Sequence, residues 1–293
     1  MSMKKLSIFL PLVLTALLWS SWYKPIHYRT TISQEEIVSC MNTETIDAYL
    51  LEASTIEFAN MHPDVKRSNQ TPFLGSMIRY NTSDGQLANG YFIPSKKKSK
   101  KWLIVIQEWW GLNEHIKREA DKYFSDLPDM NVLAIDMLDG RVAYTPDSAT
   151  KFMRETSQER MYNIVQGAIS LAGDKASIYT LGWCFGGMWS LQAGILAGPQ
   201  AKGTIMFYGR PENNLEKLKS LQCDVIGFFG NLDRSPSPEM VTAFENNMKT
   251  LGKNLTAHKY DAGHGFANPS NPRFNVEAAN DAYSKAIEFL KSH

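Results

Sequence analysis

The sequence has few cysteines and lacks the common metal and nucleotide motifs. It holds three cysteines among 293 residues, with no Cys-x-x-Cys spacing, which argues against a framework built on disulfides. It contains no His-Glu-x-x-His zinc motif, no Gly-x-x-x-x-Gly-Lys phosphate loop and no dinucleotide-binding fingerprint. These absences predict a protein without a metal or an organic cofactor.

The chain also lacks internal repeats, low-complexity tracts and an excess of charge of one sign. Its 31 basic and 30 acidic residues give a formal net charge of +1. The cationic run at residues 95–101 is expected to be a solvated loop, because only one aromatic residue adjoins it. We therefore expect no nucleic-acid partner.

A long apolar run stands near the N-terminus. Lys4 and Lys5 precede an apolar stretch from Leu6 to Leu18, which is the pattern of a secretory signal peptide. Extended to Trp22 the stretch becomes a marginal membrane anchor, since a span needs about 20 residues. Residues 1–22 therefore predict either export to the periplasm or medium, or membrane association through an uncleaved N-terminal segment.

Residues 23–70 form a polar, helix-prone extension. Ser33 followed by Glu35 and Glu36 has the form of a helix N-cap with an acidic first turn. The extension is expected either to pack on the rest of the chain or to lead to a membrane. In an oxidising compartment Cys40 and Cys223 could pair, although nothing in the sequence places them together.

The remaining residues, 71–293, alternate strand-like and helix-like segments. Apolar strand patterns are separated by helical patterns, of which the last covers residues 277–290. This order predicts one α/β domain, a mostly parallel sheet with helices on both faces. Residues 81–85 are expected to form a hairpin turn between two strands, at residues 77–80 and 87–93.

Cys184 stands in a glycine-rich turn, Gly-Trp-Cys-Phe-Gly-Gly at residues 182–187. The turn follows the apolar strand at residues 177–181 and precedes an apolar helical segment, which is the context of a nucleophile elbow. The flanking glycines suit a sharp reversal in which a Cβ would collide with its neighbours. Because the thiol would lie at a helix N-terminus, whose dipole favours a thiolate, we predict that Cys184 is a nucleophile.

An elbow nucleophile is followed in the chain by an acid and then by a histidine. Asp233 lies in a turn after a buried strand, and His264 lies in a glycine-flanked loop after another strand. Asp261 is a weaker alternative acid, whereas Asp224 precedes its strand and should lie at the wrong end of the sheet. The other histidines, which are expected at surface, extension or structural positions, are His27, His62, His115, His258 and His293.

Four segments together resemble the dienelactone hydrolase family, a cysteine-using branch of the α/β-hydrolases. They are Gln-Glu-Trp-Trp-Gly-Leu-Asn at residues 107–113, residues 136–143, the elbow at residues 182–187, and residues 263–269 with Gly-His-Gly-Phe. The resemblance covers roughly residues 75 to 292. It implies the α/β-hydrolase fold.

The resemblance also implies roles for single residues. In the family, the glutamate matching Glu108 lies beside the nucleophile and helps to control its ionisation, and backbone amides matching Trp109 and Phe185 form an oxyanion hole. Arg141 matches an arginine that binds a substrate carboxylate through its planar fork. Asn268 stands where the type member has a second substrate arginine, which leaves the substrate open.

The implied activity is cleavage of a small-molecule ester or lactone. Cys184 would attack the acyl carbon, His264 would manage the proton, Asp233 would orient His264, and water would release the acyl-enzyme. Two alternatives remain at this point. One is a thioesterase, and the other is a non-catalytic binding protein of the cell envelope that uses the N-terminal extension as a partner surface.

Overall fold

The computed structural model describes residues 44–62 and 72–293 of the chain. The predicted signal peptide or anchor at residues 1–22, the predicted N-cap at Ser33, and Cys40 all lie outside these residues. Export, membrane association and the pairing of Cys40 therefore stay predictions. Within the described residues, no helix is long and apolar enough to cross a membrane.

One sheet of eight strands runs through the described part of the chain, in the order β1-β2-β4-β3-β5-β6-β7-β8. β2 pairs antiparallel with β1 and β4, and all the other neighbouring strands are parallel. The predicted parallel sheet and the predicted hairpin are thus both confirmed. The strands are β1 Ser76–Asn81, β2 Leu87–Ile93, β3 Lys101–Ile106, β4 Asn131–Ile135, β5 Ser177–Trp183, β6 Ala201–Phe207, β7 Asp224–Gly230 and β8 Leu255–Tyr260.

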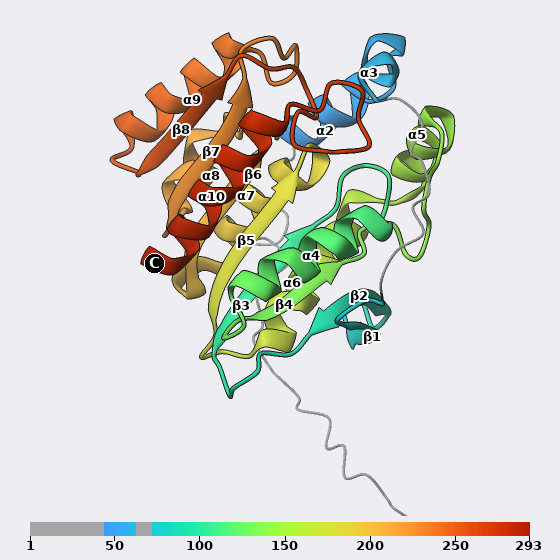
Figure 1. The fold of residues 1–293 in the computed structure, drawn as a ribbon, viewed down its shortest axis with the longest axis vertical. Coiled ribbons are helices and arrows are strands. Elements are labelled where there is room, and N and C mark those ends of the chain that lie inside the picture. The colour runs from blue at the N-terminus through green and yellow to red at the C-terminus, as the bar shows by residue number, and fades with distance from the viewer. Residues whose placement is uncertain (1–43, 63–71) are drawn as a thin grey trace, which may run out of the picture. The chain divides into compact units, whose positions relative to one another are not determined.

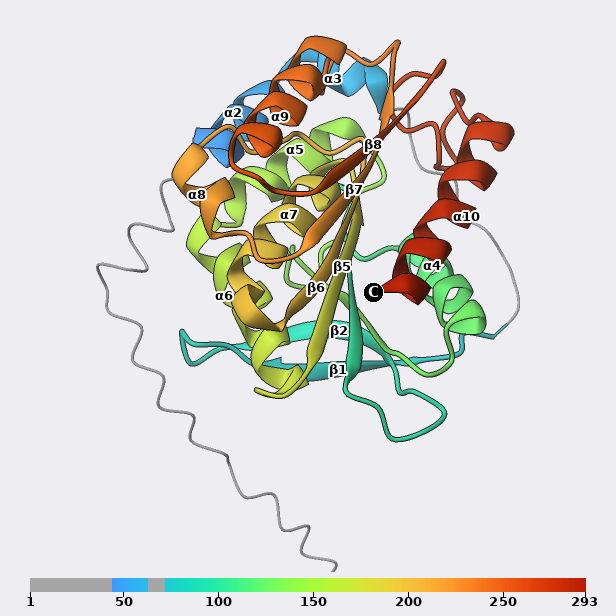
Figure 2. The ribbon, with the colours of Figure 1, turned by 90° about the vertical axis from the view of Figure 1, so that its left-hand side faces the viewer.

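Helices cover both faces of this sheet, as predicted. Figure 2 shows the sheet nearly edge-on, with α4 and α10 on one face and α6, α7, α8 and α9 on the other. The helices are α2 Glu44–Glu52, α3 Ile56–Met61, α4 Glu114–Asp126, α5 Pro146–Glu155, α6 Gln158–Ala172, α7 Phe185–Ala197, α8 Leu215–Ser220, α9 Pro238–Thr250 and α10 Val276–Ser292, with a 3₁₀ turn at Gly198–Gln200. α2 and α3 lie near the end of the sheet towards which β5 points (Figure 1).

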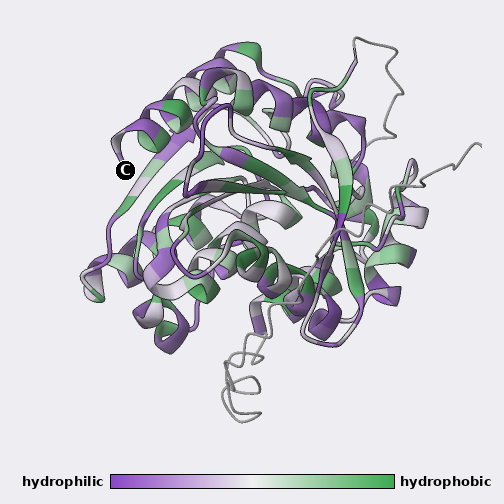
Figure 3. Ribbon diagram, turned by 90° about the horizontal axis from the view of Figure 1, so that it is seen from below, coloured by the Kyte–Doolittle hydropathy of each residue, from purple (hydrophilic) through white to green (hydrophobic). Residues whose placement is uncertain are grey.

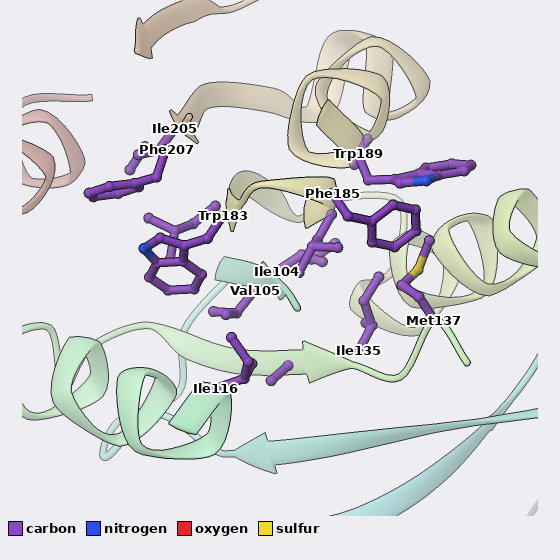
Figure 4. Close-up of a cluster of buried hydrophobic side chains, with 14 of the residues drawn as sticks. Ile104, Val105, Ile116, Ile135, Met137, Trp183, Phe185, Trp189, Ile205 and Phe207 are labelled. Carbon is purple, nitrogen blue, oxygen red and sulfur yellow. The ribbon is translucent and has the colours of Figure 1, made fainter. Parts of the chain in front are cut away.

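The apolar core lies on both sides of the central strands. Strands that are buried on two faces need nearly continuous apolar sequence, and β4, Asn-Val-Leu-Ala-Ile, is buried at every position. Figure 3 shows many green, hydrophobic residues along the strands, and both green and purple residues on the helices. In Figure 4, Trp183 and Phe185, on either side of the elbow cysteine, lie among the apolar side chains of the neighbouring strands. The elbow is therefore anchored in the core.

Helices α2 and α3, from the predicted extension, pack into this same core. Ile46, Tyr49, Ala53 and Phe58 are buried in one cluster with the elbow residues. Polar contacts add to the apolar ones, and the buried Thr45 hydroxyl donates to Glu212 over 2.7 Å. Of the two placements that the sequence left open, residues 44–62 adopt the packed one. We call residues 44–62 the cap segment.

Candidate active site

Cys184 joins β5 to α7 and is 1% exposed. Its backbone has φ 54° and ψ −117°, a region that L-residues rarely occupy and that is typical of sites under functional constraint. A Cβ at Gly182 would lie 2.1 Å from the Gly186 carbonyl oxygen, and one at Gly186 would lie 2.2 Å from the Ile106 oxygen. The two glycines therefore permit the sharp turn, and the predicted elbow is present.

Asp233 and His264 are hydrogen-bonded to each other beside the elbow. The Nδ1 atom of His264 lies 2.8 Å from Oδ2 of Asp233, and both side chains are buried. Burial acts to lower the pKa of His264, but the negative charge of Asp233 and the interaction with Cys184 raise it well above its usual value. The alternative acid, Asp261, is exposed. Asp224 is the first residue of β7 and accepts a hydrogen bond from Asn254. Asp233 is thus the carboxylate that the structure brings to His264.

Glu108 follows β3 and is 4% exposed. The Asn268 amide donates to its Oε2 atom over 2.7 Å, and the Tyr208 hydroxyl donates to Oε1 over 3.4 Å. Asn268, which stands where the resemblance implies a second substrate arginine in the type member, therefore binds the glutamate. Burial raises the pKa of Glu108 to about 7, although His264, Asn268 and Tyr208 act to lower it and Glu119 adds to the rise.

The raised pKa of Glu108 predicts a pH-dependent stability. The unfolded chain ionises this carboxyl near its usual pKa of 4.5, whereas the folded protein keeps it protonated up to about pH 7. The contribution of Glu108 to the free energy of unfolding is thus fully present below about pH 4.5. On the order of 3 kcal/mol of it is lost as the pH rises through about 7. Glu108→Gln removes this pH dependence. As the pH rises from about 4.5 to about 7, the free energy of unfolding of the variant should therefore increase relative to that of the unmodified protein.

Urea unfolding of both proteins between about pH 4 and pH 8 measures this difference. Glu216→Gln is the matched control, because the Glu216 side chain is 84% exposed and should show no such trend. A difference that stays constant with pH for Glu108→Gln would show that burial does not hold this carboxyl protonated.

The two predicted oxyanion-hole residues lie on two different segments, one of which adjoins the nucleophile in the chain. Phe185 is the first residue of α7, so its backbone N–H belongs to the helix end that has no intrahelical acceptor. Trp109 follows Glu108 in the loop after β3 and is fully buried. The two backbone amides are placed on the two segments that the family pattern requires, and their role stays a prediction.

Each nitrogen of the Arg141 guanidinium has one intramolecular partner. Its Nε atom donates to the Leu138 carbonyl over 2.8 Å, Nη1 pairs with Glu155 over 3.0 Å, and Nη2 donates to the Thr156 hydroxyl. A substrate carboxylate would compete with Glu155 for this guanidinium. The role of Arg141 as a substrate anchor therefore stays a prediction that the observed contacts do not favour.

Two residues of the site, both from the cap segment, were not predicted from the sequence. His62 was expected at a surface or extension position, but it is buried, and its Nε2 atom lies 3.4 Å from Sγ of Cys184. The Tyr49 hydroxyl lies 3.6 Å from the same sulfur. Burial lowers the pKa of His62 well below its usual value, and His264 and Arg273 act in the same direction. His62 thus lies in the extension, one of the two expected positions, but it is not a surface residue.

Arg273, five residues after Asn268, contacts the cap segment. Its guanidinium donates to the carbonyls of Met61 over 3.1 Å and Asn60 over 3.4 Å, at the C-terminal end of α3. A cation at that end also suits the helix dipole. Glu52 of α2 pairs with Arg210 and accepts from Ser235, so the segment is held on two sides of the site.

These residues make up an elbow thiol, a histidine with its carboxylate, and a helix N-terminus, set at the carboxyl ends of parallel strands. This arrangement, on an eight-stranded and mostly parallel sheet with helices on both faces, defines an α/β-hydrolase. Residues 88–293 match the dienelactone hydrolase family, and the chain belongs to that family. The predicted family and the predicted fold are both confirmed.

Two relatives are similar to this chain in sequence, and one solved structure is similar to it in fold. The protein named "Putative carboxymethylenebutenolidase" from Saccharolobus solfataricus is 26% identical over 243 residues, which are 68% of this chain and 92% of the relative. A protein of the same name from Escherichia coli O157:H7 is 25% identical over 224 residues, 65% of this chain and 76% of the relative. The dienelactone hydrolase-like promiscuous phosphotriesterase P91, from metagenomic libraries, has a similar fold, with a TM-score of 0.64, 19% identity, and coverage of 74% of this chain and 98% of P91.

Proposed function

We propose that this hydrolase cleaves a small-molecule ester or lactone through Cys184, His264 and Asp233, with an acyl-enzyme intermediate. The observation that carries the proposal is the hydrogen bond between the buried Asp233 and His264, beside a thiol held in an elbow. The Cys184 sulfur attacks the acyl carbon and the alcohol leaves with a proton from His264. A water molecule, deprotonated by His264, then releases the acid and regenerates the thiol.

The surroundings of the thiol support this sequence of steps. The Asp233 carboxylate accepts from Nδ1 of His264, which fixes the tautomer whose Nε2 faces the site. Backbone amides of Phe185 and Trp109 are the proposed donors to the oxygen that becomes negative in the tetrahedral intermediate. With Asn268 on Glu108 and Glu155 on Arg141, the proposal extends to neutral esters and lactones as well as carboxylated ones.

Trapping the acyl-enzyme tests the proposal. A small activated ester, quenched with acid during turnover, should add the mass of one acyl group, and peptide mapping should place it on Cys184. Cys223→Ala is the matched control, since Cys223 is the other free thiol in the described part of the chain. This variant should be acylated at Cys184 to the same extent as the unmodified protein. A folded protein that stays unacylated would favour the alternative, a non-catalytic binding protein. Parallel reactions with an oxygen ester and its thioester measure the preference between the two acyl groups.

The destination of the protein is a separate proposal. The basic start and apolar run within residues 1–22 support export, with the segment either cleaved or kept as an anchor.

A further inference from the structure

A sulfur and two imidazole nitrogens meet at the nucleophile. One ring nitrogen each of His62 and His264, and Sγ of Cys184, lie within 4.8 Å of one another, and all three side chains are buried. Thiolate sulfur and imidazole nitrogen are the ligands that zinc takes in proteins. We propose that His62, Cys184 and His264 together bind a divalent cation of the zinc class, and that Zn²⁺ bound there blocks the nucleophile.

The spacing of the three atoms suits a tetrahedral ion. Zinc lies about 2.3 Å from sulfur and about 2.0–2.1 Å from nitrogen, so ligand atoms of a tetrahedral site are about 3.3–3.6 Å apart. The observed distance from Nε2 of His62 to Sγ is 3.4 Å. The three ligand atoms lie within 4.8 Å of one another, so a small shift of the side chains would bring all three to zinc-binding distance. The fourth position of the tetrahedral ion would then be left for water.

Each imidazole is held by an acceptor on its far side. Nδ1 of His62 lies 2.7 Å from the Phe58 carbonyl oxygen, and Nδ1 of His264 lies 2.8 Å from the Asp233 carboxylate. A carbonyl can only accept, so Nδ1 of His62 carries the hydrogen and its Nε2 presents a lone pair towards Sγ. Among the residues that the structure describes, Nε2 of His264 is a buried atom without a hydrogen-bond partner. Acceptors behind ligand imidazoles are the usual outer shell of zinc sites.

Charge and packing also suit the ion. Zn²⁺ on one thiolate and two neutral imidazoles keeps a single positive charge, and the buried carboxylate of Asp233 offsets it. The rings of Phe58 and Trp109 pack against His62, with centroids 4.1 Å and 4.7 Å away, and exclude bulk water. The protons that leave the thiol and the imidazoles on binding go to solvent.

Zinc at this position would oppose hydrolysis in two ways. It takes the lone pairs of Sγ and of Nε2 of His264, the two atoms that the proposed chemistry needs. It also ties the residue after α3 to the elbow and so holds the cap segment closed over Cys184. The inhibition rests on the proposed function, whereas the binding of the metal does not.

Metal binding is measured on the full chain after treatment with a chelator. Added Zn²⁺ should bind with one ion per chain, by elemental analysis after dialysis. At about 100 times its dissociation constant it should raise Tm by about 5–10 °C. Co²⁺ in its place should give the near-ultraviolet band of a thiolate ligand, and this band should be absent in Cys184→Ala.

His62→Ala is the deciding variant. Loss of an outer-shell partner weakens zinc sites by about 10–100-fold, so loss of a ligand should weaken binding by more than about 100-fold. His62→Gln serves if the alanine variant does not fold, because it keeps a buried polar side chain without an imidazole. His258→Ala, in β8, is the matched control and should bind Zn²⁺ like the unmodified protein.

Two results would overturn the proposal. One is a Tm that does not respond to Zn²⁺, and the other is an affinity that is unchanged in the folded His62 variants. Tight zinc binding without any ester hydrolysis would contradict the proposed function but would still support the metal site. Zinc binding together with inhibition that both disappear in the His62 variants would support the two proposals together.

Discussion

Cys184→Ala is expected to abolish ester hydrolysis while the protein keeps its fold. The substitution removes only the sulfur, and the elbow backbone is held by the flanking glycines and by the buried neighbours Trp183 and Phe185. Loss of a covalent nucleophile costs on the order of 10⁴–10⁶-fold in kcat, because the residual rate comes from the oxyanion hole and substrate binding alone. Steady-state rates with an activated ester measure the loss.

The fold of that variant has to be shown separately from its activity. Circular dichroism and a thermal scan should give a spectrum and a Tm close to those of the unmodified protein. Cys223→Ala, at a partly buried thiol hydrogen-bonded to Thr204, should retain normal kcat/KM. Undiminished turnover in a folded Cys184→Ala protein would remove Cys184 from the mechanism.

The sequence predicted the parts of the site whose signal is local. An elbow needs glycines two residues before and two residues after its nucleophile. This pattern is visible within six residues, 182–187. The order of nucleophile, acid and histidine follows from the order of the strands, so Asp233 and His264 could be selected by their positions after β7 and β8. The choice of Asp233 over Asp261 rested on this geometry, and the hydrogen bond to His264 agrees with it.

The cap segment could not be predicted in the same way. His62 and Cys184 are 122 residues apart in the sequence. Their contact depends on how the two short helices of the cap segment pack on the folded α/β domain. α3 has six residues, which is too short for a clear period of apolar positions. A single histidine before a proline gives no sign of burial, so only the tertiary structure places it at the thiol.

The intramolecular partner of Arg141 could not be predicted from the motif either. The residue lies in the segment that resembles the family, but Glu155, 14 residues later at the end of α5, pairs with its guanidinium. A motif specifies which residue type stands at a position, whereas the partner of a long side chain depends on what packs nearby. The charge of the substrate therefore stays a prediction.

Asp233→Asn is expected to lower kcat by about 10⁴-fold, the size of the effect when a triad loses its orienting anion. The backbone N–H of Ser235 donates to Oδ1 of Asp233 over 2.9 Å, and this bond selects the orientation of the new amide. Its oxygen would keep the Ser235 bond, so its NH₂ group would face Nδ1 of His264. The histidine would then carry its hydrogen on Nε2, pointing at the site, and could not accept a proton from the thiol.

Asp261→Asn is the matched control for this result, because Asp261 is exposed and lies three residues before the same histidine. It should leave kcat within about twofold, since Asp233 alone is bonded to the ring. Comparable Tm values for both variants would assign the difference in rate to the tautomer of His264 rather than to unfolding. A large loss in Asp261→Asn with little loss in Asp233→Asn would transfer the role of the acid to Asp261 and leave Cys184 and His264 in place. Equal, small losses in both would mean that His264 works without an orienting carboxylate.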